Sequence, residues 1–318
     1  DPYDVIAFGI GISAICLNLL IYIALVRTTF NFTTNIRLVV SLSVSDIVIG
    51  ASSVLFVVNK AFVFNSPDWI LPVCFALILK AMNSVGLMSN LLNLMLMAID
   101  HYLAIMSPLK HMIMRQDLIK KLLILLWMAS IIIGFSDFFS GTTHTDLSYC
   151  DSIQRTIYRE EYLTIAVACV CFFVMTFVYI RLFCRLKSHR IPGIDLRQKF
   201  KTTGKSLITT FLALVVFVVT WLPKICLMLT MEFKMYFDAE EVKRNLHFYL
   251  KMEDILYILL LFGPIGDFII YTVRLKEVKQ GMCMMFSTSR TQQANLTAMT
   301  RLSSKRQSSR RSESIQLM

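Results

Sequence analysis

The segment Val5–Val26 contains no charged side chain, and a helix of about 20 apolar residues is long enough to cross a bilayer. Six further apolar segments follow it: Leu38–Val58, Cys74–Ile99, Leu122–Phe135, Leu163–Ile180, Ser206–Met231 and Ile255–Val273. The alternation typical of a β-barrel does not occur, and helices satisfy their own backbone hydrogen bonds in lipid. The sequence therefore predicts an all-α membrane protein with a bundle of seven transmembrane helices.

The fourth of these segments is short for a span. It extends over Leu118–Phe139 if Lys120 and Lys121 reach the headgroups with their flexible side chains. After the seventh segment, Arg274–Phe286 repeats apolar residues at helical spacing, which predicts a short amphipathic helix on the membrane surface. We therefore expect a membrane domain over residues 1–286. Residues 287–318, rich in Ser, Thr and basic residues, are expected to form a disordered tail.

The basic residues predict the orientation, because cytoplasmic loops of membrane proteins carry an excess of Lys and Arg. Seven spans place the chain ends on opposite sides, and the side with the C-terminal tail holds 23 of the 32 Lys and Arg residues. We expect the C-terminus in the cytoplasm and the N-terminus outside the cell. The net charge of +11 reflects this bias and does not call for a nucleic-acid partner.

Polar side chains inside a membrane are costly and mark functional positions. With a rise of about 1.5 Å per residue, four of them fall in one layer near the inner half of the bundle: Asn18, Asp46, Asn90 and Asp267. Two carboxylates and two amides at one depth could share a cation or a proton. The alternative is a hydrogen-bonded network that only fixes how the helices pack.

A second polar layer is predicted roughly 27–31 Å from the inner face, around the outward mouth of the bundle. It contains Lys80, Asn83, Lys224, Glu253 and Asp254, with Tyr257 one turn deeper. One or two of the lysines could bind an acidic group of a ligand. Alternatively, the lysines only extend to the headgroups or pair with the two acids.

The stretch "AIDHYLAI" places Asp100, His101 and Tyr102 at the cytoplasmic end of the third span. A metal-dependent hydrolase needs several clustered ligands, and no histidine other than His101, at the end of the third span, is expected in the membrane. Asp100 and His101 cannot form a catalytic dyad, because adjacent helical residues do not face each other. The pattern argues against an enzyme and favours a conformational switch. A seven-helix transporter is also disfavoured, because no relay residues connect the two buried acids to the inner face.

The order of motifs on these spans resembles the rhodopsin-like (class A) G-protein-coupled receptors. The resemblance covers about Ile10–Phe286 and rests on Asn18, "SLSVSD" ending at Asp46, Asp100-His101-Tyr102 in place of Asp-Arg-Tyr, Trp127, Tyr179, "FVVTWLP" and "DFIIYTVRLKEV". It implies a plasma-membrane receptor that binds an extracellular ligand and transmits a conformational change to a heterotrimeric G protein.

The resemblance also implies roles for individual residues. A sodium site is expected at Asp46, Asn90 and Asp267. Ligand-binding positions are expected at Lys80, Asn83, Leu87, Trp221, Lys224, Glu253, Asp254 and Tyr257. Switch and coupling positions are expected at Asp100, His101, Tyr102, Tyr179, Phe217, Pro223 and Tyr271. Cys74 and Cys150 match the disulfide at the outer face, and Cys283 is a candidate for palmitoylation.

Several positions depart from the family pattern. His101 replaces the arginine that meets the G protein. Phe268 stands where the seventh span usually has proline, although Pro264 lies one turn earlier. Asn83 stands where amine receptors have an aspartate, so a cationic amine loses its anchor, and the lysines of the outer layer favour an acidic ligand. These departures leave open an atypical receptor of the same fold that signals through arrestin or does not couple.

Two further expectations concern regulation. Histidine changes charge near about pH 6.5, unlike arginine, so lower cytoplasmic pH should favour the active state through His101 unless this ring stays neutral and only fills space. In the tail, Lys305–Ser314 places serines beside arginines, a pattern that basophilic kinases accept. The added phosphates could bind arrestin. Alternatively, the basic tail lies on anionic lipid.

Overall fold

The computed structural model describes residues 2–28, 33–63, 70–106, 116–136, 162–188 and 196–286, and this part of the chain is almost entirely helical. Its helices are Pro2–Thr28 (α1), Thr34–Val63 (α2), Ile70–Met106 (α3), Gln116–Gly134 (α5), Tyr162–Ser188 (α7), Leu196–Phe237 (α8), Ala239–Arg244 (α9), Leu246–Leu261 (α10), Gly263–Arg274 (α11) and Lys276–Phe286 (α12). The prediction of an all-α protein is confirmed.

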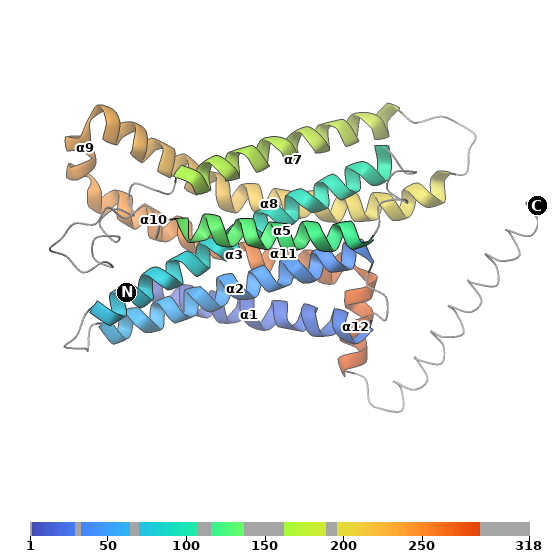
Figure 1. Ribbon diagram of the computed structural model, residues 1–318, viewed down its shortest axis with the longest axis horizontal. Helices are drawn as coiled ribbons and strands as arrows, with labels where there is room; N and C mark the ends of the chain where they lie inside the picture. The colour runs from blue at the N-terminus through green and yellow to red at the C-terminus, as the bar shows by residue number, and fades with distance from the viewer. Residues whose placement is uncertain are drawn as a thin grey trace, which may run out of the picture.

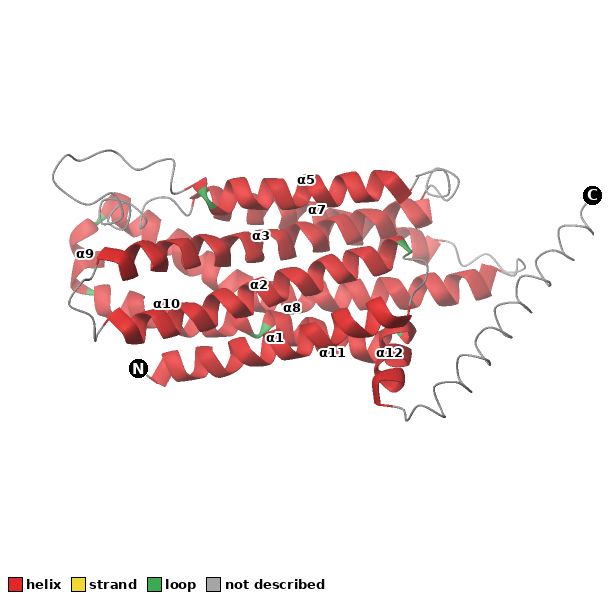
Figure 2. Ribbon diagram, turned by 60° about the horizontal axis from the view of Figure 1, so that its bottom comes forward, coloured by secondary structure: helices red, strands yellow, loops and turns green. Residues whose placement is uncertain are grey.

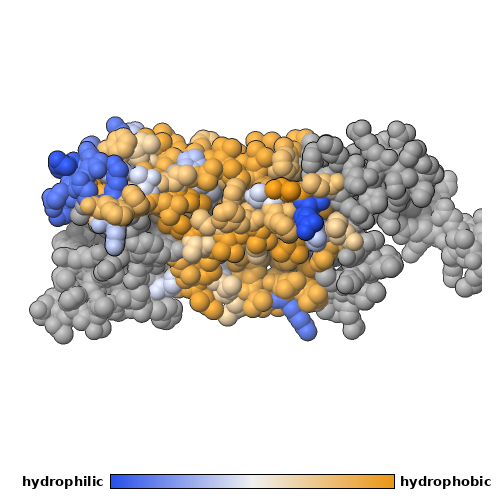
Figure 3. Space-filling view, turned by 90° about the horizontal axis from the view of Figure 1, so that it is seen from above, coloured by the Kyte–Doolittle hydropathy of each residue, from blue (hydrophilic) through white to orange (hydrophobic). Residues whose placement is uncertain are grey.

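The long helices lie side by side as one elongated bundle (Figures 1 and 2). The short helix α9 lies at one end of the bundle and α12 lies across the other; we call these the α9 end and the α12 end. Figure 3 shows an apolar surface over the middle of the molecule and hydrophilic side chains at the α9 end. This distribution is the one expected of helices that cross a membrane.

Six segments are long and apolar enough to span a bilayer: Pro2–Arg27, Thr34–Ala61, Cys74–Ala104, Leu163–Leu182, Leu214–Phe237 and Leu246–Val273. The remaining predicted span is α5, which has 19 residues with Asp117, Lys120 and Lys121 close to its start. This helix packs along α3, and its Ile124 and Ile132 point to the outside of the bundle. The seven predicted spans are therefore confirmed as a seven-helix bundle.

The helices extend beyond the apolar segments from which they were predicted. The longest, α8, begins at Leu196 and has 42 residues, so it starts well before the predicted span Ser206–Met231. A hydropathy pattern marks only the part of a helix that lies in lipid, while Lys, Arg and Gln are good helix formers in water. The Pro192-Gly193 pair lies outside the described residues.

The seventh span consists of two helices that meet at Phe262. Pro264 lies in the first turn of α11, where a proline is tolerated because its missing N–H would have no partner within the helix. Phe268, at the position of the family's proline, simply continues α11. Pro264 therefore lies just after the break between the two helices of the seventh span.

The amphipathic helix after the last span is also confirmed, as α12. It packs against α1, and its Val278 is fully buried. Gly281 makes this approach possible, because a Cβ atom there would overlap the backbone of Ala24. A similar contact joins α1 to α2, where a Cβ on Gly50 would lie 2.7 Å from the Gly11 carbonyl oxygen.

Candidate functional site

Three polar side chains meet in the centre of the bundle, from α2, α3 and α11. Asp46, Asn90 and Asp267 are all buried, and the Asn90 side-chain amide donates to Asp46 Oδ1 at 2.6 Å. Asn90 also lies next to the Asp267 carboxyl group. Asp46 Oδ2 accepts no hydrogen bond from the part of the chain that the structure describes. The sequence-based prediction that these three residues share a site is consistent with this arrangement.

A small cavity lies directly beside this polar cluster. Asn90 and Asp267 form part of its wall, and Phe217, Thr220 and Trp221 of α8 form another part. It has room for a water molecule or an ion of similar size. Carboxylate and amide oxygens are the ligands that hard cations such as sodium prefer, so the donor set around the cavity fits such an ion.

Asn18 has a different role from the other members of its predicted layer. Its side-chain amide donates to the carbonyl oxygens of Ala14 and Pro264, at 3.0 and 3.1 Å. The Pro264 carbonyl belongs to the start of α11, just after the break in the seventh span. Asn18 therefore holds α1 against this break, and no hydrogen bond to either buried acid is found within the described residues.

The residues predicted to bind a ligand lie toward the α9 end from the cavity. Leu87 and Trp221 line the cavity itself, and the Trp221 ring packs on Phe217 with ring centroids 5.3 Å apart. The Lys224 Nζ atom lies 5.7 Å from the centroid of the Tyr257 ring. Asn83 Oδ1 accepts a hydrogen bond of 3.2 Å from Ser52. Residues from α2, α3, α8 and α10 are thus brought together.

The predicted acids of the outer layer do not pair with the lysines, which was one of the two alternatives for these lysines. Glu253 is half-buried and Asp254 is exposed, and neither forms an ion pair within the described ranges. Lys60 instead pairs with Asp4 of α1 at 2.8 Å. Sequence reasoning missed Asp4, because the apolar run starts only after it.

Two of the predicted switch residues, His101 and Tyr271, meet at Met97 of α3 toward the α12 end, whereas Phe217 lines the central cavity. His101 is only 5% exposed, and its Nδ1 lies 2.7 Å from the Met97 carbonyl oxygen. A carbonyl only accepts, so Nδ1 carries a proton there. The Tyr271 hydroxyl of α11 donates to Met97 Sδ at 3.9 Å. No motif in the sequence points to Met97, because it is an apolar residue in an apolar helix.

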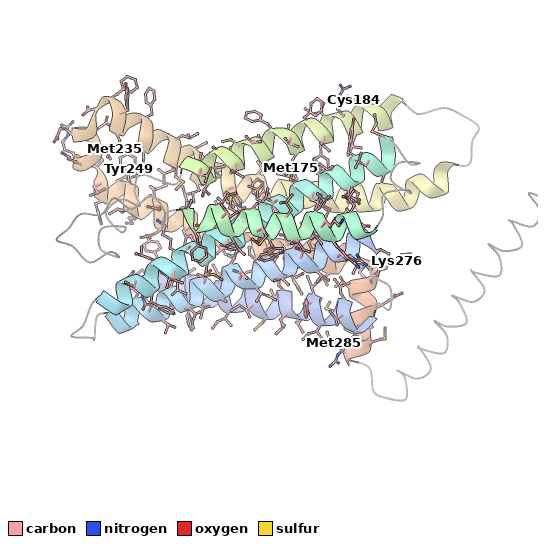
Figure 4. All side chains as sticks on the ribbon, viewed as in Figure 1. Met175, Cys184, Met235, Tyr249, Lys276 and Met285 are labelled. Carbon is pink, nitrogen blue, oxygen red and sulfur yellow. The ribbon has the colours of Figure 1, made fainter. Side chains whose placement is uncertain are left out.

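The other switch residues belong to α3, α7 and α8. Asp100 is buried, and Tyr102 packs against the apolar core. Tyr179 of α7 packs edge-on against Phe211 of α8, with centroids 5.8 Å apart. Pro223 lies inside α8. Side chains such as Met175 fill the interior of the bundle, whereas Lys276 and Met285 belong to the α12 surface helix (Figure 4).

The described cysteines are of two kinds, disulfide-bonded and free. Cys74 is disulfide-bonded, while its predicted partner Cys150 lies outside the described residues. The other six cysteines are free, and Cys283 is exposed on α12. The predicted phosphorylation segment, Lys305–Ser314, also lies outside the described residues.

Comparison with known families gives one match. The model of the family described as 7 transmembrane receptor (rhodopsin family) matches residues 17–271, a range that begins just before Asn18 and ends at Tyr271. A comparison with curated proteins finds no match.

Proposed function

The chain belongs to the rhodopsin family of seven-transmembrane receptors, and from this premise we propose that it binds an extracellular ligand at the plasma membrane and activates a cytoplasmic heterotrimeric G protein. The excess of basic residues toward the C-terminus supports an extracellular N-terminus and a cytoplasmic C-terminus. The α9 end is then the outer end and the α12 end the inner one. No catalytic step is part of this proposal.

The observation that carries the proposal is a series of neighbouring side chains that leads from the central cavity to the α12 end. Trp221 packs on Phe217 at the wall of the central cavity. Asp267 forms another part of that wall, and Tyr271, one turn further along α11, reaches Met97 beside His101. A displacement of Trp221 by a ligand can therefore change the packing around the inner ends of α3 and α11. Pro223 supplies a point about which α8 can bend.

We also propose that Asp46, Asn90 and Asp267 bind a sodium ion in the inactive state. Two carboxyl groups in a buried site repel each other when both are ionised, and a bound cation would offset that repulsion. The support is the oxygen-rich donor set and the Asp46 Oδ2 atom that accepts no hydrogen bond from the described residues. When the bundle opens, separation of α2 from α11 would release the ion.

The ligand in this proposal is acidic. Lys224 faces the interior beside Tyr257, and Asn83 supplies no negative charge at the place where amine receptors have one.

The arginine- and serine-rich segment Lys305–Ser314 is proposed as a kinase substrate that recruits arrestin after phosphorylation. Replacing Ser308, Ser309, Ser312 and Ser314 by alanine should then reduce arrestin recruitment.

The direct test is nucleotide exchange on purified Gα subunits of each class, with the full chain reconstituted in lipid. Phe217 is 4% exposed and lies under Trp221, so Phe217→Ala should lower basal exchange by more than half. Phe173 is 70% exposed on the outside of α7, and Phe173→Ala is the matched control that should change little. Wild-type protein that activates no Gα class would overturn the G-protein part of the proposal.

A second candidate function is signalling through arrestin without G-protein coupling. The specific observation in its favour is His101, which is short, buried and bonded to the backbone of its own helix, where the family's arginine reaches the G protein. Arrestin recruitment that persists while every Gα class stays inactive would favour this candidate.

A further inference from the structure

We propose that the ligand carries a single carboxylate group, bound by Lys224 against Tyr257, with hydroxyl and amide groups of α2 and α3 at the side of the site. This inference rests on the proposed receptor function and specifies its ligand. It starts from the position of Lys224, which lies inside the membrane-spanning segment Leu214–Phe237. A charged side chain there is costly in lipid, and such residues face the interior and normally meet a partner of opposite charge.

Lys224 faces the interior but has no such partner within the described residues. Its Nζ atom lies over the Tyr257 ring, 5.7 Å from the centroid, and it forms no ion pair with any described acid. The nearest candidate in the sequence, Glu253, lies one turn from Tyr257 on the same helix and stays unpaired. A cation–π contact of this kind orients the ammonium group without neutralising it.

Three helices place polar groups at the same level as Lys224. Asn83, Lys224 and Tyr257 each lie three or four residues toward the outer end from a residue that lines the central cavity: Leu87, Trp221 and Leu260. Residues at these spacings share one face of a helix. The polar groups therefore form a layer directly above the apolar floor made by these three side chains.

A fourth helix, α2, also contributes polar groups to this layer. Ser52 donates to Asn83 Oδ1 at 3.2 Å, and the Tyr257 hydroxyl faces Ser53. At the level of Asn83, the site thus offers the positive charge of Lys224 and several hydroxyl and amide groups that can donate to an oxygen anion, while Lys80 lies one turn further out on α3. Ser52 leaves the Asn83 amide nitrogen available as a donor, because the contact uses only the carbonyl oxygen of that side chain.

The charge balance selects a carboxylate over a phosphate. One ammonium group balances one negative charge, whereas a phosphate monoester carries close to two at neutral pH. The extra charge would lie in a poorly solvated site with Glu253 one turn away, where like charges repel strongly. Trp221, Leu87 and Leu260 below the polar layer favour an apolar or aromatic group attached to the carboxylate.

The test is thermal unfolding of the purified full-length chain with phenylacetate as the probe. Phenylacetamide serves as its neutral counterpart and phenyl phosphate as its dianionic one. A ligand that binds only the folded state raises Tm, and we expect phenylacetate to raise it by about 2 °C or more. Phenylacetamide and phenyl phosphate should give less than half of this shift. An equal shift with the amide, or a larger one with the phosphate, would overturn the proposal.

Three variants show whether Lys224 is responsible. Lys224→Met should abolish the shift, and Lys224→Arg should retain it. Lys234→Met is the matched control on the same helix, because Lys234 is already paired with Glu241 at 2.5 Å, and it should respond like the wild type. If Lys224→Met does not fold, Lys224→Arg and the three probes still decide the question. A full shift in folded Lys224→Met would overturn the assignment.

Hexadecanoate is included beside phenylacetate to distinguish a ligand that enters from the bilayer from one that enters from water. A shift with either carboxylate supports the site, and no shift with both overturns it. Because unfolding reports binding alone, a failed nucleotide-exchange experiment leaves this inference intact. Equally, a missing Tm shift leaves the receptor assignment standing.

Discussion

Among single residues, His101 is the one that we expect to control coupling. It is a titratable side chain at the position where the family has a permanently charged arginine. Its ring is buried and bonded to the Met97 carbonyl. If opening the inner end admits water to the ring, protonation and the open state favour each other. We expect wild-type basal exchange to rise when the pH falls from about 7.5 to about 6, and His101→Arg to be more active and insensitive to this change.

The matched control for this experiment is His247→Arg. His247 is exposed on α10 near the opposite end of the bundle, so its replacement should leave both the activity and its pH dependence unchanged. A wild type with the same activity at both pH values would discard the switch. An inactive His101→Arg variant would discard the role of this position in G-protein contact.

The sequence identified the central acids and His101 because charged and titratable groups stand out in an apolar segment. It could not identify Met97 or Asp4, for two physical reasons. Met97 matters through its two contacts, and an apolar residue in an apolar helix has no pattern of its own. Asp4 precedes the apolar run, and only the folded bundle brings it within 2.8 Å of Lys60.

On the scale of helices, the close approach of α1 and α2 depends on glycine. Adding a Cβ atom at Gly50 would place it 2.7 Å from the Gly11 carbonyl oxygen and 3.0 Å from Ile15 Cγ1, so one of the helices must move. We expect Gly50→Ala to destabilise the protein by about 1–3 kcal/mol, as other overpacked sites do. Thermal unfolding of the full chain measures this effect.

Gly9 provides the comparison, because a Cβ atom there meets nothing within 4 Å. Alanine in a helix interior is favoured over glycine by roughly 0.5–1 kcal/mol. Gly9→Ala should therefore leave Tm unchanged or raise it slightly. Equal losses in the two variants would show that the close approach of α1 and α2 at Gly50 does not determine the result.

A second prediction for this scale concerns Asn18, which holds α1 against the break in the seventh span. Asn18→Leu removes the hydrogen bond to the Pro264 carbonyl, and the loss of one such bond destabilises a protein by about 0.5–1.5 kcal/mol. Ser13→Ala is its control, because the exposed Ser13 hydroxyl bonds only to the preceding turn of its own helix. If both variants unfold at the wild-type temperature, the Asn18 contact does not stabilise the bundle.

The seven spans could be predicted because exposing polar groups to lipid is costly, so the spans are long segments of mostly apolar residues. Pro264 predicted the break at Phe262 for a local reason, its missing N–H. The ends of the helices were less predictable. Beyond the membrane, helix formation depends on propensity and packing, so hydropathy did not indicate that α8 begins at Leu196.

For the whole molecule, we expect sodium to stabilise the inactive bundle. If sodium is present at ten times its Kd, the stabilisation amounts to about 1.4 kcal/mol, measured as a higher Tm in sodium chloride than in choline chloride. Asp46→Asn should abolish the difference, because the amide removes one carboxylate from the site. Asp254→Asn, at an exposed position without an ion pair among the described residues, should keep it. Identical wild-type unfolding in the two salts would rule out the site.

The hydrogen bond from Asn18 to Pro264 also has a consequence for the time course of biosynthesis. The two residues are 246 positions apart, and chains emerge at about 5–20 residues per second. The first helix therefore waits roughly 10–50 s in the membrane before its acceptor has been made. A polypeptide that stops before Gly263 never supplies this acceptor. In such a chain the Asn18 amide keeps only its bond to the Ala14 carbonyl of its own helix among the two described here.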